Sequence, residues 1–174
     1  MLVGLIADSF VIAQEFMTRG LYSLKKAEPT SALVSGVNLE AVKTNHLAEY
    51  EIQRNTESRD GEYLMVLYNS DTQRKVEMSA RIFPSVSDAE YGALDMLNSR
   101  SAIFTNGTPS GRAIGDNAWY FMREKTGATT ILFVRKNVVV SIFAEELAMA
   151  RTLAETMDAD ILAGKNGIVL MGHK

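Results

Sequence analysis

The residue types that most often perform chemistry in proteins are scarce in this sequence. The 174 residues include two histidines and no cysteine, which removes thiolate nucleophiles, disulfides, zinc ribbons and iron–sulfur sites. His46 lies in the polar run Lys43–Leu47, and His173 is next to last. A metal site needs two or more well-placed ligands. We therefore predict no metal site and no cofactor, and we interpret His46 as a solvated or capping side chain.

Short patterns that resemble catalytic motifs lack their companions. Ser23–Lys26 matches Ser-x-x-Lys, but the other motifs of that chemistry are absent. Gly107–Arg112 has the glycines of a phosphate loop, yet a strand follows it, so no helix N-terminus would face an anion. Glu145 and Glu146 would point about 100° apart on a helix, so first-turn dipole stabilisation explains them better than acid–base work. Asp158 and Asp160 form a second carboxylate pair, and we assign them no acid–base role either. We therefore name no catalytic residues.

Concentrated aromatic residues give the one functional indication that we retain. Trp119, Tyr120 and Phe121 are consecutive on a predicted strand, where side chains alternate between the two faces. Core packing is the default, whereas an exposed aromatic face would mark a binding surface. Arg135 lies at the tip of a predicted hairpin, with Arg123 nearby. We take Trp119, Tyr120, Phe121 and Arg135 as the candidate binding residues.

Net charge argues against one class of partner. The formal charge is −3 at pH 7, and nucleic-acid surfaces need more positive charge than this chain offers. No apolar run reaches about 18 residues, so we predict no transmembrane segment. Asp8 within the first apolar stretch, with no leading basic residue, argues against an intact signal peptide.

The elements that would position these residues follow from periodicity. Residues 74–83 alternate cleanly between apolar and polar side chains, which is typical of a strand with one face on a core. Pro84 ends this strand, and Ser85 or Ser87 then caps a helix. We predict strands near 62–68, 74–83, 118–123, 129–135 and 138–143, weaker ones near 47–55 and 168–171, helices near 86–98 and 144–163, and a loop over 98–115.

The order strand–strand–helix occurs twice, in residues 62–98 and 118–160. Hairpins outnumber strand–helix alternations, so we predict an α+β fold with an antiparallel sheet and helices on one face. The predicted buried residues are Val76, Met78, Ile82, Leu94, Leu97, Leu132, Val139, Leu153 and Met157.

Three segments make up the predicted domain organisation. Residues 1–27 place apolar groups at helical spacing and indicate an N-terminal amphipathic helix. Residues 28–37 are the best linker candidate, and residues 38–174 form a single α+β domain. A helix of about 24 residues spans about 36 Å, which is more than a small core can cover. We therefore expect the N-terminal helix to contact a protein partner or a second copy of the chain.

The C-terminal half also resembles a known group of domains. Residues 114–120 read Ile-Gly-Asp-Asn-Ala-Trp-Tyr, residues 132–142 read Leu-Phe-Val-Arg-Lys-Asn-Val-Val-Val-Ser-Ile, and a Leu/Ala-rich helix follows. Together, over residues 75–163, these resemble uncharacterised bacterial extracytoplasmic domains of lipoprotein-borne and sensor-like proteins. The resemblance implies an extracytoplasmic location with any signal removed, and it brings no catalytic motif. The chain lacks a lipobox cysteine, so a cytoplasmic location is the alternative.

Three hypotheses for the function follow. The first is a non-catalytic binding or protein-interaction module of unknown ligand. The second is a hydrolase-like enzyme with a site built from Asp, Glu, Arg and Ser, and the third is a structural subunit of a homo-oligomer. A buried cleft holding carboxylates with shifted pKa values favours an enzyme, whereas a shallow apolar face favours the other two.

Overall fold

The computed structural model describes Tyr22, Leu24 and residues 32–109 and 111–171. The helix that we predict over residues 1–27 lies outside these residues, apart from Tyr22 and Leu24, as do residues 28–31 of the predicted linker. His173 and Ser23–Lys26, except Leu24, lie outside them too.

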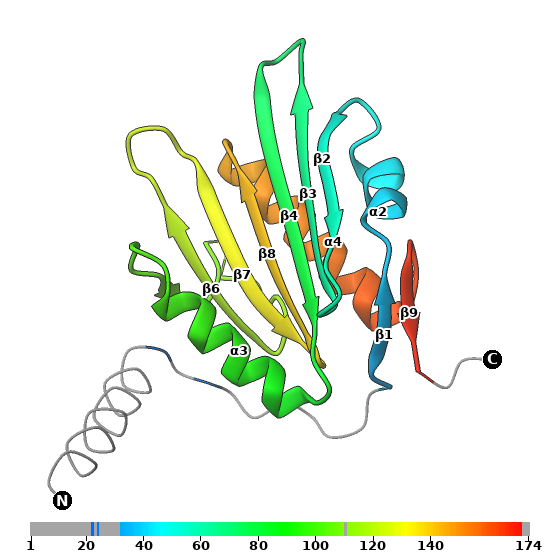
Figure 1. The fold of residues 1–174 in the computed structure, drawn as a ribbon. Coiled ribbons are helices and arrows are strands. Elements are labelled where there is room, and N and C mark those ends of the chain that lie inside the picture. Colours follow the sequence, from blue (N-terminus) through cyan, green and yellow to red (C-terminus); the bar gives the residue numbers. More distant parts are fainter. Residues whose placement is uncertain (1–21, 23, 25–31, 110, 172–174) are drawn as a thin grey trace, which may run out of the picture.

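A seven-stranded antiparallel sheet is the centre of the fold (Figure 1). Its order is β2-β3-β4-β8-β7-β6-β5, and each neighbouring pair is antiparallel. The strands are β2 (Glu51–Glu57), β3 (Glu62–Asn69), β4 (Arg74–Ile82), β5 (Thr105–Asn106), β6 (Asn117–Met122), β7 (Thr129–Arg135) and β8 (Val138–Ala144). The predicted α+β class and antiparallel pairing are confirmed. Each bound of the five strands predicted with clear periodicity differs from the observed bound by at most one residue.

A second sheet pairs the two ends of the described chain. β1 (Val34–Val37) and β9 (Ile168–Leu170) are antiparallel. The prediction of a linker over 28–37 is therefore wrong for residues 34–37. Val34 is fully buried, and its N–H donates to Asn137 Oδ1 at 2.7 Å. Local composition does not reveal this strand, because its partners lie more than a hundred residues away in sequence.

Three helices complete the described fold: α2 (Leu39–His46), α3 (Val86–Asn98) and α4 (Leu147–Ala163). The bounds of α3 match the prediction, because Ser85 Oγ accepts from Asp88 N at 3.1 Å and fixes its start. α2 was not predicted. The expected first-turn role of Glu145 and Glu146 is wrong, since both precede α4. Lys75 N donates to Glu145, and Glu146 pairs with Arg74, so both carboxylates bind β4.

The helices lie on both faces of the large sheet, and the prediction of one helical face is wrong. Ile131 and Phe133 of β7 belong to the core cluster that contains α4 residues, whereas Leu132 and Val134 belong to the cluster that contains α3 residues. Alternate side chains of one strand point to opposite faces, so α3 and α4 cover opposite faces (Figure 1). The uninterrupted apolar run in β7 is typical of a strand buried on both sides. Of the predicted core residues, all are buried except Ile82, which is half-buried.

Candidate ligand-binding site

The α3 face of the sheet carries an aromatic row beyond the end of the helix. Phe121 of β6 pairs with Thr130 of β7, and Thr130 pairs with Phe143 of β8. Directly paired residues of adjacent strands share one face, so these three side chains form a continuous row. All three are half-buried. The row is the floor of a hollow.

Two loops build the walls of this hollow. Ser99–Ala102 and Phe104 follow α3 on one side, and Arg123 and Ala128 flank the β6–β7 turn on the other. The volume is about 350 Å³, at the small end of the range of roughly 300–1,000 Å³ for small-molecule sites. We refer to this floor and these walls together as the basic–aromatic hollow.

Arg100 is the most informative side chain of the basic–aromatic hollow. Its Nη2 donates to Ser141 Oγ at 3.1 Å, and its guanidinium carbon lies 5.6 Å from the centre of the Phe104 ring. Burial lowers the pKa of Arg100 below its ordinary value, and the negative charge of Glu77 acts in the opposite direction. Glu77 itself forms its ion pair with Lys75. Within the described residues, no carboxylate lies within ion-pair distance of Arg100.

Arg123 brings a second guanidinium to the same hollow. Its backbone closes the β6–β7 turn, because Arg123 N donates to Ala128 O at 2.9 Å and Gly127 N donates to Arg123 O at 2.8 Å. The side chain is exposed and forms no ion pair with any residue that the structure describes. Two guanidiniums that form no ion pair with any described residue therefore lie beside an aromatic floor.

The three consecutive aromatic residues named from the sequence are separated by the sheet. Trp119 is fully buried, and its ring meets Tyr22 edge-on at 6.4 Å. Its Nε1 is buried and has no hydrogen-bond partner among the residues that the structure describes, so Trp119 is a core residue and presents no binding surface. Tyr120 points to the opposite face and packs against the α4 cluster. Phe121 alone lines the basic–aromatic hollow.

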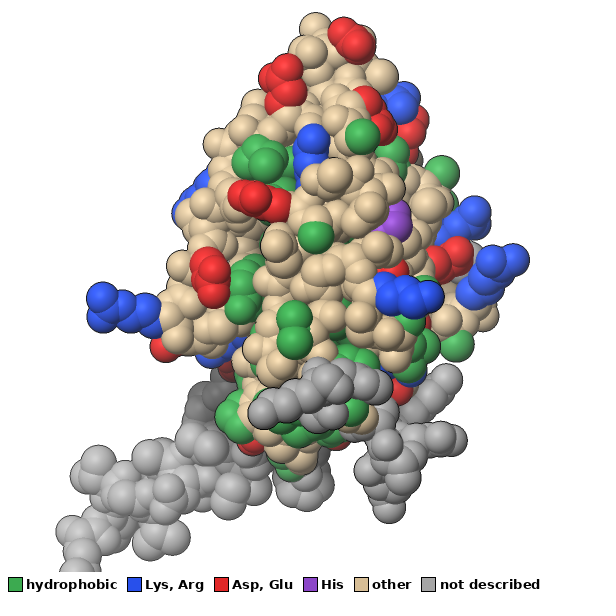
Figure 2. Space-filling view, turned by 90° about the vertical axis from the view of Figure 1, so that its right-hand side faces the viewer, with side chains coloured by type: hydrophobic (Ala, Val, Ile, Leu, Met, Phe, Trp, Pro, Cys, Tyr) green, Lys and Arg blue, Asp and Glu red, His purple; other side chains and the backbone are tan. Residues whose placement is uncertain are grey.

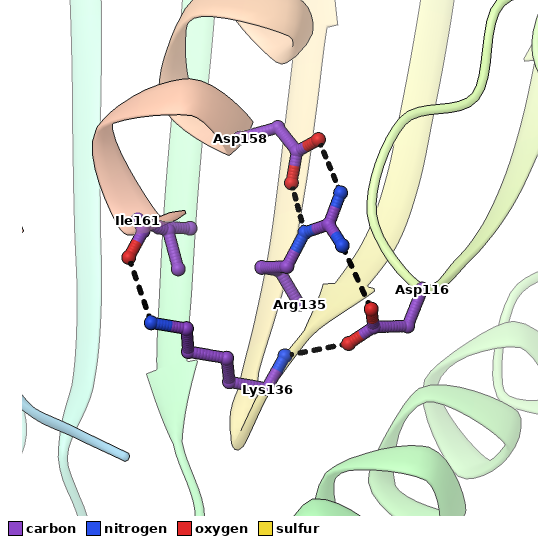
Figure 3. A network of polar contacts seen from close by, with 5 residues as sticks. All are labelled: Asp116, Arg135, Lys136, Asp158 and Ile161. Atoms are coloured by element: carbon purple, nitrogen blue, oxygen red, sulfur yellow. Dashed lines mark hydrogen bonds and ion pairs between the residues drawn. The ribbon is translucent and has the colours of Figure 1, made fainter. Parts of the chain in front are cut away.

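Arg135, the fourth predicted binding residue, is engaged in a network at the β7–β8 hairpin (Figure 3). Its Nε and Nη2 donate to the two oxygens of Asp158 at 2.5 and 2.7 Å, and its Nη1 donates to Asp116 at 2.8 Å. The hydrogen bonds from Arg135 to Asp158 are the main reason that the pKa of Arg135 is raised. The guanidinium therefore connects the loop before β6 to α4, and we assign it a structural role.

Lys136 completes the same network. Its backbone N–H donates to Asp116 Oδ2 at 2.8 Å, and its Nζ donates to Ile161 O at 3.4 Å near the end of α4 (Figure 3). The residue is buried, and burial, with the charge of Arg135, lowers its pKa. A cation at the C-terminus of a helix is favoured by the helix dipole. The hairpin tip thus holds α4 in place.

The carboxylates of the Asp158–Asp160 pair serve separate contacts. Asp160 Oδ2 lies 3.0 Å from His46 Nε2, and Asp160 Oδ1 accepts from Asn166 Nδ2 at 2.8 Å. The sequence gives no sign of the contact between His46 and Asp160, because the two residues are 114 positions apart. Among the described residues, no group of three or more acidic or histidine side chains is placed to hold a metal ion.

A larger cleft lies on another side of the molecule, between α2 and the β2–β3 edge. It has a volume of about 510 Å³, and its polar lining includes Glu40, Asn55, Glu57 and Tyr63. Asn55 Nδ2 donates to Glu40 Oε1 at 2.8 Å, and burial, followed by the charge of Glu57, raises the pKa of Tyr63. Figure 2 views the side of α2, β1 and β9, where acidic and basic side chains are interspersed. That surface offers no continuous field of one sign.

No helix in the described part of the chain combines the length and apolar character needed to cross a membrane.

Sequence reasoning missed most of the basic–aromatic hollow. Arg100 and Phe104 fall in the segment 98–115, which we predicted as a loop, and the side-by-side placement of Phe121 and Phe143 depends on strand register. One signal was present: Ser141 interrupts the apolar run of β8, and a hydroxyl there needs a hydrogen-bond partner.

Comparison with protein-family models, curated proteins and solved structures finds no match to this chain.

Proposed function

We propose that this protein is a non-catalytic binding module that takes a small anionic molecule in the basic–aromatic hollow. The observation that carries the proposal is Arg100, a charged side chain held against Ser141 and Phe104 without a carboxylate in ion-pair distance among the described residues. Arg100 is an exposed residue whose guanidinium is held in place by Ser141. It therefore offers a positioned positive charge that a small anion can reach from solvent without reorganising the side chain.

The composition of the hollow favours binding over catalysis. Its described lining contains the hydroxyls of Ser99, Ser101 and Thr130 but no Asp, Glu or His. A hydroxyl acts as a nucleophile when an adjacent base activates it, and this lining offers no such base. The hydrolase-like alternative is therefore less well supported than a binding site.

Two further parts of the proposal rest on the sequence. An extracytoplasmic location is supported by the resemblance of residues 114–120 and 132–142 to extracytoplasmic domains. Contact with a protein partner or a second copy through residues 1–27 is supported by the helical spacing of their apolar side chains. Light scattering of the full chain and of a variant lacking residues 1–27 tests this contact: a dimer that becomes a folded monomer supports it, and a full-length monomer contradicts it.

Thermal unfolding in the presence of sodium acetate, benzoate and phosphate tests the anion site. A ligand at ten times its Kd stabilises the folded state by about 1.4 kcal/mol, so at least one anion should raise Tm progressively as its concentration increases above its Kd. Arg100→Gln should abolish that increase. Arg59→Gln is the matched control, because Arg59 is exposed in the β2–β3 turn and outside the lining of the hollow. Equal responses of the two variants, or no increase in Tm with any of the three anions, would contradict the proposal.

A further inference from the structure

We infer that the ligand of the basic–aromatic hollow is a monocarboxylate with a body of one or two aromatic rings. The inference rests on the proposed function and specifies its ligand class. Four features of the hollow support it: the shape of the floor, the donor geometry of Arg100, the charges around it and the length of the aromatic row.

The floor is suited to a flat ring. The rings of Phe104 and Phe121 have their centres 6.0 Å apart and are tilted by 44°, within the range of roughly 4.5–7 Å that aromatic pairs prefer. Phe143 lies in the same row, one strand beyond Thr130. Phe104 is buried, so an aromatic ligand would meet mainly the half-buried rings of Phe121 and Phe143 in the floor.

Arg100 is arranged for a carboxylate. A guanidinium has five N–H donors in a planar fork that matches the two oxygens of a carboxylate. One Nη2 donor is used by Ser141, and Phe104 lies beside the guanidinium. The remaining donors are free of ion pairs within the described residues, and Thr130 lines the floor of the same hollow.

The surrounding charges favour an anion with a single charge. The hollow begins at Ser99, directly after the C-terminal end of α3, and that end of a helix carries a partial negative charge. No basic residue lies in the last turn of α3 to offset it. Glu77, which pairs with Phe143 in the sheet, lies at the edge of the row and forms its ion pair with Lys75. Arg100, held by Ser141, matches the single negative charge of a carboxylate, and the exposed side chain of Arg123 lies at the opposite wall.

The length of the row limits the apolar body. The row crosses β6, β7 and β8 and ends at Glu77 of β4, the residue next to Phe143. Two strand spacings of about 4.8 Å give roughly 10 Å between Phe121 and Phe143. That length suits one or two fused rings. A long alkyl chain would extend over Glu77 and lose its apolar contact.

Isothermal titration calorimetry with four probes tests the inference: 1-naphthoate, the neutral 1-naphthalenemethanol, decanoate and inorganic phosphate. We expect 1-naphthoate to bind one to one and more tightly than each of the other three. Arg100→Gln should weaken its binding at least tenfold. Arg100→Lys, which keeps the charge but loses the planar fork, should weaken it as well. Arg59→Gln should bind like the unchanged protein, and circular dichroism should show that all variants are folded.

The outcomes separate the inference from the proposed function. If phosphate binds through Arg100 and 1-naphthoate does not, the ligand class is wrong and the anion site stands. Decanoate binding as tight as 1-naphthoate overturns the aromatic body, and equal binding of the neutral alcohol overturns the carboxylate. If no probe binds, or if 1-naphthoate binds Arg100→Gln undiminished, both the inference and the assignment of this site fail.

Discussion

Replacing Arg135 by methionine should be strongly destabilising, because one guanidinium is shared by two carboxylates. Arg135 donates two hydrogen bonds to Asp158 and one to Asp116. The side chains of Asp158 and Asp116 are only 9% and 18% exposed. Methionine fills similar volume and removes the charge, so both carboxylates would remain in a poorly solvated place without their cation.

The magnitude follows from burial. Removing one partner of a buried ion pair costs about 3–5 kcal/mol, and the residual exposure of Arg135, at 17%, places the expected loss near the lower end, about 3 kcal/mol. Arg74→Met is the matched control. Arg74 also pairs with a glutamate, Glu146, but both side chains are more than 40% exposed, so we expect a loss below about 1 kcal/mol.

Urea unfolding followed by far-ultraviolet circular dichroism measures both losses. The double variant Arg135→Met/Asp158→Leu should recover part of the lost stability, because it removes one of the uncompensated charges together with the cation. A coupling free energy of about 2 kcal/mol is expected for residues in such contact. A loss for Arg135→Met no larger than that for Arg74→Met would contradict a shared, buried guanidinium. Simple additivity of Arg135→Met and Asp158→Leu would contradict it as well.

Three other substitutions test separate parts of the structure. Asn137 is fully buried, and its Nδ2 donates to Val34 O and Phe83 O. Asn137→Asp would place a carboxylate oxygen against these two carbonyl oxygens and should lower the free energy of unfolding in urea by about 3 kcal/mol or more; a near-neutral effect would contradict these hydrogen bonds. Burial, with the charge of Asp116, raises the pKa of Glu90. The charged form is thus disfavoured on folding, and Glu90→Gln should stabilise the protein at about pH 7 and lose this advantage at about pH 3, where the carboxyl is neutral in both states; a pH-independent difference would argue against this cause. Leu153→Ala removes a buried side chain of α4 and should cost about 2–5 kcal/mol, and an unchanged Tm would show that this face of α4 is not core.

Local patterns in the sequence predict the elements of this fold well. The alternation of β4 and the cap at Ser85 are visible within a few residues, and both β4 and α3 form almost where expected. The faces on which the helices pack depend instead on long-range contacts. The order of hairpins and helices predicts that all helices lie on one face of the sheet. The uninterrupted apolar run of β7 indicates instead that both faces of the sheet are covered.

The candidate site was less predictable from the sequence, because strand register aligns its floor and an irregular loop after α3 supplies its wall. Phe121 was identified from its aromatic neighbours, but the alternation that selects it also buries Trp119 in the core. Arg135 was expected at an exposed tip, and its partners, 19 and 23 positions away, are carboxylates that local sequence does not connect to it. Arg100 follows α3 in a segment without periodicity, so only the folded chain brings it to Ser141.

Chemical-shift mapping of the isotope-labelled protein with 1-naphthoate tests the assignment of the basic–aromatic hollow most directly. We expect saturable changes with a single Kd for the backbone amides of Ser99–Phe104, Phe121, Thr130 and Phe143, and for the side-chain Nε–H of Arg100. Changes confined to the cleft of Glu40, Asn55, Glu57 and Tyr63, or a spectrum without changes at saturating probe, would contradict it.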